Sequence, residues 1–91
     1  MTGEQADAIL AEMMSWEEWR ELPVTRGFLR RLAEEREAAD GVVHATNAVE
    51  YPGRIAYSQG QYDALTAVLE YPDHEIQRLR YVLNTQGKEQ A

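Results

Sequence analysis

The chain has 91 residues, no cysteine and a formal net charge of −7 at pH 7. A chain of this length supports one small domain, and without disulfides or thiolate zinc sites we expect a partner chain, identical or not, to complete its stability. The acidic balance disfavours direct nucleic-acid binding, which needs a basic stripe, and no apolar run approaches the ~20 residues of a membrane-spanning helix.

Residues 1–22 are predicted to form an acidic N-terminal helical segment. It holds six acids, Glu4, Asp7, Glu12, Glu17, Glu18 and Glu21, against the single base Arg20. Its apolar residues recur at the spacing of one helical face: Ile9, Leu10, Met13 and Met14. Ser15 and Glu18 have the spacing of a capping box, which predicts a new short helix or a kink there. Pro23 predicts a break after Leu22.

Two longer helices are predicted over residues 25–39 and 54–70. Thr25 is a suitable N-cap for the first, and Gly41 is placed to end it in the left-handed conformation. Residues 42–50 are predicted to be a loop, and Tyr51-Pro52-Gly53 marks a turn before the second helix. The apolar faces of the two helices are Phe28, Leu29, Leu32 and Ala39 in the first, and Ile55, Tyr62, Leu65 and Leu69 in the second.

The last predicted helix covers residues 73–84, after a restart at Tyr71-Pro72-Asp73. Its apolar face is Ile76, Leu79, Val82 and Leu83. Residues 85–91 are expected to be a frayed tail. The predicted fold is therefore all-α: an antiparallel helical hairpin with short flanking N- and C-terminal helices, in one small domain over residues 1–91.

No residue pattern in the sequence indicates catalysis, a cofactor or a metal. His44 is expected in a polar loop without ligands at suitable spacing, and His74 is expected to face solvent near a helix start. Neither serine belongs to a nucleophile elbow, and the one glycine of Ser58-Gln59-Gly60-Gln61 does not make a phosphate loop. We expect a protein that is not an enzyme, with no catalytic, cofactor-binding or metal-binding residues.

The charges of the helix predicted over 25–39 oppose its macrodipole. Arg26, Arg30 and Arg31 crowd its start, and Glu34, Glu35 and Glu37 crowd its end. This arrangement is unfavourable by a few tenths of a kcal/mol unless negative charge lies close to the arginines. That charge can come from Glu17, Glu18 and Glu21 of the same chain, or from an acidic surface on a partner protein.

Trp16, Trp19, Pro23 and Phe28 form an aromatic corner, and both tryptophans share one helical face. These side chains can staple the N-terminal segment onto the core. Alternatively they anchor a partner, since tryptophan is the most enriched side chain at interface hot spots. In that second interpretation the partner-binding residues are Trp16, Trp19, Pro23, Phe28, Arg26 and Arg30.

The same stretch resembles the opening of short, mostly uncharacterised proteins of tailed bacteriophages and prophages. The resemblance rests on Glu18-Trp19-Arg20-Glu21-Leu22-Pro23-Val24-Thr25, followed by Phe28-Leu29, Leu32 and Glu35-Arg36-Glu37. It covers about residues 16–37, with weaker support from residues 54–70. The acidic residues 1–14, the Tyr51-Pro52-Gly53 turn and the chain after Tyr71 depart from it. The resemblance implies a virion or head-assembly accessory.

The expected function is that of a non-enzymatic phage structural or assembly protein that docks in multiple copies on a capsid, portal or tail. We expect a protein partner or a homo-oligomer, no direct nucleic-acid or membrane partner, and a location in the host cytoplasm and then the virion. The polar, acidic N-terminus is the reverse of a signal peptide. The alternative is a small acidic inhibitor of a host protein, of the anti-restriction or anti-CRISPR type, and a helical regulatory domain comes third.

Overall fold

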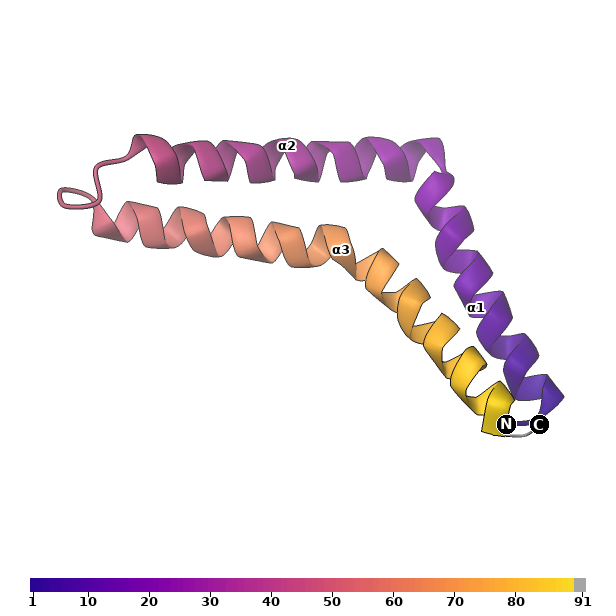
Figure 1. The fold of residues 1–91 in the computed structure, drawn as a ribbon. Coiled ribbons are helices and arrows are strands. Elements are labelled where there is room, and N and C mark those ends of the chain that lie inside the picture. Colours follow the sequence, from indigo (N-terminus) through magenta and orange to yellow (C-terminus); the bar gives the residue numbers. More distant parts are fainter. Residues whose placement is uncertain (90–91) are drawn as a thin grey trace. The chain divides into compact units, whose positions relative to one another are not determined.

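A computed structural model describes residues 1–89, and all of the regular structure in that range is helical, as predicted. Helix α1 spans Gly3–Glu21, α2 spans Pro23–Ala45 and α3 spans Pro52–Glu89 (Figure 1). None of these helices combines the length and apolar character that a membrane crossing requires. The described chain is thus built entirely from the packing of helices on one another.

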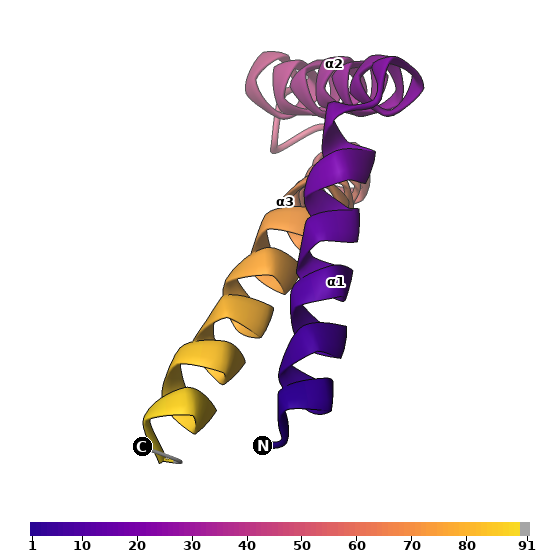
Figure 2. The same cartoon turned by 90° about the vertical axis from the view of Figure 1, so that its right-hand side faces the viewer.

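The chain divides into two compact units. The terminal unit contains residues 1–25 and the chain from Tyr71 onward, and the central unit contains Arg26–Glu70. In the terminal unit, α1 lies beside the C-terminal part of α3 (Figures 1 and 2). In the central unit, α2 lies antiparallel to the first part of α3 (Figure 1). Each unit is therefore a pair of helices.

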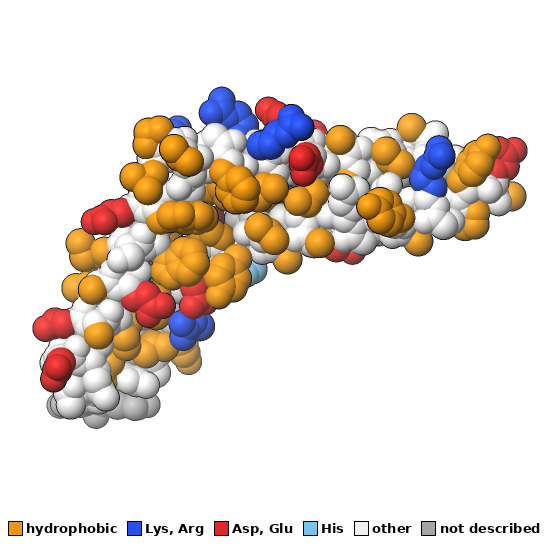
Figure 3. All heavy atoms as spheres, turned by 180° about the vertical axis from the view of Figure 1, so that it is seen from behind, with side chains coloured by type: hydrophobic (Ala, Val, Ile, Leu, Met, Phe, Trp, Pro, Cys, Tyr) orange, Lys and Arg blue, Asp and Glu red, His pale blue; other side chains and the backbone are white. Residues whose placement is uncertain are grey.

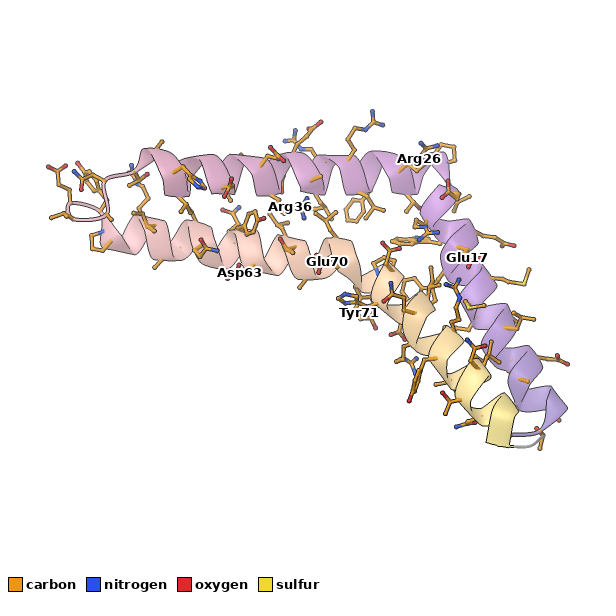
Figure 4. The ribbon with its side chains drawn as sticks, in the orientation of Figure 1. Glu17, Arg26, Arg36, Asp63, Glu70 and Tyr71 are labelled. Carbon is orange, nitrogen blue, oxygen red and sulfur yellow. The ribbon has the colours of Figure 1, made fainter. Side chains whose placement is uncertain are left out.

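The seam of the central unit follows the 3-4 spacing of a coiled coil on both helices. Its buried and half-buried positions are Leu29, Leu32, Arg36, Ala39 and Val43 on α2, and Ile55, Ser58, Tyr62, Leu65 and Leu69 on α3. The guanidinium of Arg36 lies 5.9 Å from the ring centroid of Tyr62, between the two helices (Figure 4). This cation–π contact places residue 36 of α2 at the level of residue 62 of α3.

The seam of the terminal unit has the same spacing. Its half-buried and buried positions are Ala6, Ile9, Met13 and Trp16 on α1, and Pro72, Ile76, Leu79 and Leu83 on α3. Leu79 is 3% exposed and Ile76 is 5% exposed, whereas α1 contributes no buried residue. The apolar centre of this unit is consequently provided mainly by α3.

Helix α1 is continuous, so the short helix predicted from Ser15 and Glu18 does not exist. The Ser15 hydroxyl donates to the Ala11 carbonyl, 2.9 Å away and one turn earlier. A mid-helix serine can be satisfied in this way without ending the helix. The capping box is instead at the helix start, where Thr2 and Gln5 exchange side-chain to backbone hydrogen bonds of 3.1 and 2.9 Å.

The predicted break before Pro23 is confirmed, but Thr25 is not the cap of the next helix. Leu22 is extended, with φ −63° and ψ 138°. Helix α2 begins at Pro23 itself, because proline lacks the N–H that would be unsatisfied at a first helical position. Thr25 lies within the first turn and is buried.

Helix α2 also passes through Gly41, where the sequence predicted its end. No glycine in the described residues has a positive φ, so Gly41 continues the helix to Ala45. His44 therefore lies in the last helical turn and not in a loop, with its Nδ1 2.9 Å from the Asp40 carbonyl oxygen. The loop predicted over 42–50 is confined to residues 46–51, where the Asn47 side chain accepts hydrogen bonds from the backbone of Val49 and Glu50.

The predicted restart at Pro72 is wrong, since α3 is continuous from Pro52 to Glu89. Pro72 has no N–H to give to the carbonyl of Val68, a defect that is unfavourable by about 3 kcal/mol in a helix interior. Pro72 is buried, and Ile76 and Leu79 continue the same stripe, so packing offsets the defect. Residues 85–89 of the predicted frayed tail are helical, and residues 90 and 91 lie outside the described part.

A cap of α1 at Thr2, as observed, and a helix start at Ser15, as the sequence predicted, differ in the expected effects of two alanine substitutions. Thr2→Ala removes the observed cap of α1, so we expect it to lower the free energy of unfolding by about 1 kcal/mol. Ser15→Ala removes only a mid-helix hydroxyl, so we expect no loss. Thermal unfolding followed by circular dichroism measures both, with Thr2→Ser as the control. A larger loss for Ser15→Ala would contradict the position of the helix start.

Candidate protein-interaction surface

An aromatic cluster lies at the end of α1 in the terminal unit. The ring centroid of Trp16 is 5.8 Å from that of Trp19 and 5.7 Å from that of Tyr71, both edge to face. Trp16 is half-buried, whereas Trp19 and Tyr71 are exposed. Trp16 of α1 therefore packs against Tyr71 of α3, and the exposed ring of Trp19 packs against Trp16.

Ion pairs between the two helices flank the cluster. Arg20 of α1 pairs with Asp73 of α3, and Glu17 of α1 lies 3.8 Å from Arg80 of α3. These four side chains line a shallow cavity of about 300 Å³ with Ile76 and Gln77. Two acids and two bases line the cavity, so their formal charges sum to zero.

Two of the three acids that could neutralise the arginines of α2, Glu17 and Glu21, have partners in the terminal unit. Glu17 pairs with Arg80, and Glu21 lies 3.8 Å from Arg20. In the central unit, Arg31 lies 3.8 Å from Glu34 and 3.6 Å from Glu35, one turn further along α2.

Arg26 and Arg30 differ from Arg31, because neither has a carboxylate within ion-pair distance in the central unit. Both side chains are exposed. The unfavourable charge order of α2 is therefore only partly compensated within this unit.

The structure brings together only part of the predicted partner-binding set. Trp16, Trp19 and the exposed Pro23 belong to the terminal unit. Phe28, Arg26 and Arg30 belong to the central unit, where Phe28 is 54% exposed. The predicted set is therefore divided between the surfaces of the two units.

A second exposed apolar surface, which the sequence did not predict, lies on the central unit. We call it the apolar face and define it by its large exposed side chains, Phe28 and Val42 of α2 and Tyr57 and Val68 of α3. Tyr57 is the most exposed of them, at 75%. Figure 3 shows hydrophobic side chains gathered along this side of the unit.

Helical geometry explains why these four residues share one side. Each precedes a seam position by one residue: Phe28 precedes Leu29, Val42 precedes Val43, Tyr57 precedes Ser58 and Val68 precedes Leu69. One residue is a rotation of about 100° around a helix. Because the helices are antiparallel, the residues that immediately precede the seam positions lie on the same side of the unit in both helices. The forward step gives the opposite side, with Arg26, Glu37, Asp40 and Asp63.

Glu75 and Arg78, one turn apart on α3, form an ion pair that shifts the pKa of both groups. Arg78 donates to both carboxylate oxygens of Glu75, from Nε at 3.2 and 3.1 Å and from Nη2 at 2.7 Å. These bonds hold the pKa of Glu75 below its ordinary value and raise that of Arg78. Both residues lie on α3 one turn apart, so the pair supports the helix.

The described residues contain no group of three or more histidines and carboxylates that could hold a metal ion. No protein-family model, curated protein sequence or solved structure matches the chain significantly. The exposed surfaces of both units combine aromatic and aliphatic side chains with charged ones.

Trp16 and Trp19 differ in burial, so they should differ in their effect on stability. Trp16→Ala removes two ring contacts and part of the seam, and we expect a loss of about 2–3 kcal/mol. Trp19→Ala removes one contact of an exposed ring, and we expect about 1 kcal/mol. Urea unfolding measures both. Equal losses would contradict the assignment of Trp16 as the staple.

The depressed pKa of Glu75 gives an acid-dependent contribution to stability. Such a carboxylate stabilises the fold above its unfolded pKa of about 4.3, and the stabilisation disappears as the pH falls through the lower folded value. We expect acidification below about pH 4.5 to destabilise the wild type more than Glu75→Gln. The urea midpoint between about pH 6 and pH 2 measures this, and Glu50→Gln in the loop is the control. Parallel wild-type and Glu75→Gln curves would contradict it.

Proposed function

We propose that this protein is a non-enzymatic bacteriophage structural or assembly protein that docks in multiple copies on a larger virion component, a capsid, portal or tail. One observation supports docking above all: no large side chain is fully buried in the described residues, while aromatic and aliphatic side chains are exposed in both units. The phage setting comes from the resemblance of residues 16–37.

The burial pattern favours association on energetic grounds. Buried apolar area stabilises by about 25 cal/mol per Å², and ordering each residue is unfavourable by about 1–2 kcal/mol. Among the described residues, the buried apolar ones are Ala39, Pro72, Ile76 and Leu79 alone. Small domains with so little core usually gain stability from a metal, disulfides or a partner, and this chain has no cysteine.

In this proposal the central unit is the helical hairpin, and the exposed ring of Trp19 is the anchor of the terminal unit. Leu22 and Val24 of the same unit are further exposed apolar side chains. An aromatic ring on a rigid support beside charged side chains is the usual composition of a protein-interaction hot spot. The protein assembles in the host cytoplasm and is then carried in the virion.

The acidic-inhibitor alternative requires carboxylates along one exposed face. Glu4, Asp7 and Glu12 are exposed on α1. Asp7 and Glu12 are five residues apart, however, which places them about 140° apart around the helix. Glu4 lies between them around the helix, so the three carboxylates share one exposed half of α1, but this acidic face is confined to the first three turns of that helix, whereas the inhibitor alternative needs a longer one.

The experiment compares Trp19→Ala with a neutralised variant carrying Glu4→Gln, Asp7→Asn and Glu12→Gln. Copies of each variant in purified particles of the encoding phage are counted by mass spectrometry, and circular dichroism reports helicity and melting. We expect Trp19→Ala to lower occupancy at least ~30-fold, as truncation of an anchor at an interface does, and the neutralised variant to incorporate normally. Trp19→Phe, which keeps an aromatic ring, is the matched control.

Three other outcomes have distinct meanings. Loss of a host target by the neutralised variant, with Trp19→Ala tolerated, supports the inhibitor. A decrease in incorporation that only follows the folded fraction assigns Trp19 to stability. Normal incorporation of a stably folded Trp19→Ala variant contradicts the role proposed for this residue.

A further inference from the structure

We propose that the terminal unit binds one amphipathic helix of a partner protein, which has apolar side chains eleven residues apart and basic side chains between them. This helix lies over the seam of α1 and the C-terminal part of α3 and completes a three-helix bundle. The inference deepens the proposed function, on which it rests, because it names the chemistry of the segment that the virion component presents.

One side of the terminal unit carries the residues that immediately precede the seam positions. On α3 these residues are Tyr71, Glu75, Arg78 and Val82. On α1 they are Ala8, Glu12, Ser15 and Trp19, the last of which precedes Arg20, the next position of the stripe after Trp16. Because the two helices are antiparallel (Figures 1 and 2), both sets lie on one side of the unit, which we call the docking side.

Among the described residues, no ion pair joins the two helices on the docking side. Glu17, Asp73 and Arg80 each follow a seam position, so the pairs that join α1 to α3, with Arg20 as the fourth member, lie on the opposite side. The ion pair of the docking side, between Glu75 and Arg78, runs along α3 alone. A third helix can therefore approach the seam on the docking side without separating an interhelical ion pair.

Apolar contact area is available at both ends of the docking side. At one end Trp19 is 37% exposed and Tyr71 is 54% exposed, and both rings pack on that of Trp16. At the other end is a shallow cavity of about 400 Å³, lined by Met1, Gln5, Ala8, Ile9, Val82 and Gln86. Trp19 and Ala8 are eleven residues apart, and so are Tyr71 and Val82. Both helices thus set the same distance between the two ends.

This distance fits a helix as the occupant. Eleven residues of α-helix rise about 16 Å and return to nearly the same direction after three turns, so two side chains with that spacing reach both ends. A third helix packed 8–10 Å from the other two covers the seam between them. An extended segment finds no such fit, because the backbone groups inside α1 and α3 are already bonded within their helices and cannot pair with a strand.

The charge of the docking side favours a basic helix. Glu12 of α1 and Glu75 of α3 lie between its two ends, together with the base Arg78. Hydrogen bonds to Glu75 raise the pKa of Arg78, and the charge of Glu12 raises it further, so two carboxylates share one guanidinium. The terminal unit as a whole has nine acids and four bases, a net charge of −5. Lysine or arginine side chains in the middle of the partner helix are therefore attracted, and acidic ones are repelled.

Tryptophan fluorescence tests the docking side directly, since the two tryptophans of the chain, Trp16 and Trp19, lie at one end of it. The probe is an amidated, alanine-rich helical peptide with two leucines eleven residues apart and two lysines between them. Titration of the full chain should give a saturable change with a dissociation constant below about 100 μM. Two control peptides should bind at least ~10-fold more weakly. One has glutamate in place of both lysines, and the other has its leucines nine residues apart, on opposite faces of the helix.

Charge reversal on two sides of α1 locates the binding surface. Glu12→Lys puts a second base beside Arg78, so it should weaken binding of the lysine peptide at least ~10-fold and strengthen binding of the glutamate peptide. Asp7→Lys is the matched control, because it makes the same reversal about 140° away around α1 and should change binding by less than ~3-fold. Circular dichroism verifies that each variant keeps its helices.

Glu12→Gln removes the charge without reversing it. An exposed charge pair is worth at most about 1 kcal/mol, so this variant should bind the lysine peptide within ~5-fold of the wild type and still enter particles. A loss as large as that of Glu12→Lys would contradict the repulsion from Arg78 as its cause.

A lysine peptide that gives no saturable change up to about 1 mM would overturn this inference. Equal binding of the three peptides, or equal weakening by Glu12→Lys and Asp7→Lys, would also overturn it. These titrations contain no phage particle, so their failure is separate from failure of the docking proposal. A chain that enters particles through Trp19 but does not bind the lysine peptide would contradict the helix alone. A chain that binds the peptides as expected but never enters particles would contradict the docking alone.

Discussion

A pair of helices has one seam and buries few side chains, and this constraint shapes both units of the molecule. Each unit of this protein is such a pair, so its seam residues are mostly half-buried. Within its own unit, each helix pair has no third helix to cover the side chains just beside the seam. Exposed Phe28 and Tyr57 on the central unit, and Trp19 on the terminal unit, are direct consequences. In the proposed function, association with other chains adds the stability that a third or fourth helix would provide.

Local sequence signals predicted a helix end correctly where a single physical effect determines the backbone conformation. Pro23 restricts Leu22 to extended backbone, so that break followed from the sequence. Pro72 carries the same local signal, yet α3 continues through it because burial of Pro72 and its neighbours along the seam outweighs one lost hydrogen bond. Gly41 was likewise misread as a helix end. Local preference cannot show which of these positions packing overrides.

The candidate surfaces were predicted in part, for a related reason. The spacing of Trp16 and Trp19 places them on one helical face, and the structure brings their rings together. Tyr71 was missed as their neighbour because it is far away in the sequence. The apolar face was missed because its residues, such as Val42 and Val68, are isolated in the sequence. They meet on one side only when the register of two antiparallel helices is known.

The concentration dependence of the melting temperature tests the central claim most directly, namely that association completes the core of this protein. A chain stabilised by other copies must melt at higher temperature as its concentration rises, because mass action favours the assembled state. We expect the midpoint measured by circular dichroism to rise by several degrees between about 1 and 100 μM, with helicity retained at the upper end. A midpoint that stays constant over this range would show that the two helix pairs are stable alone, and would contradict the account.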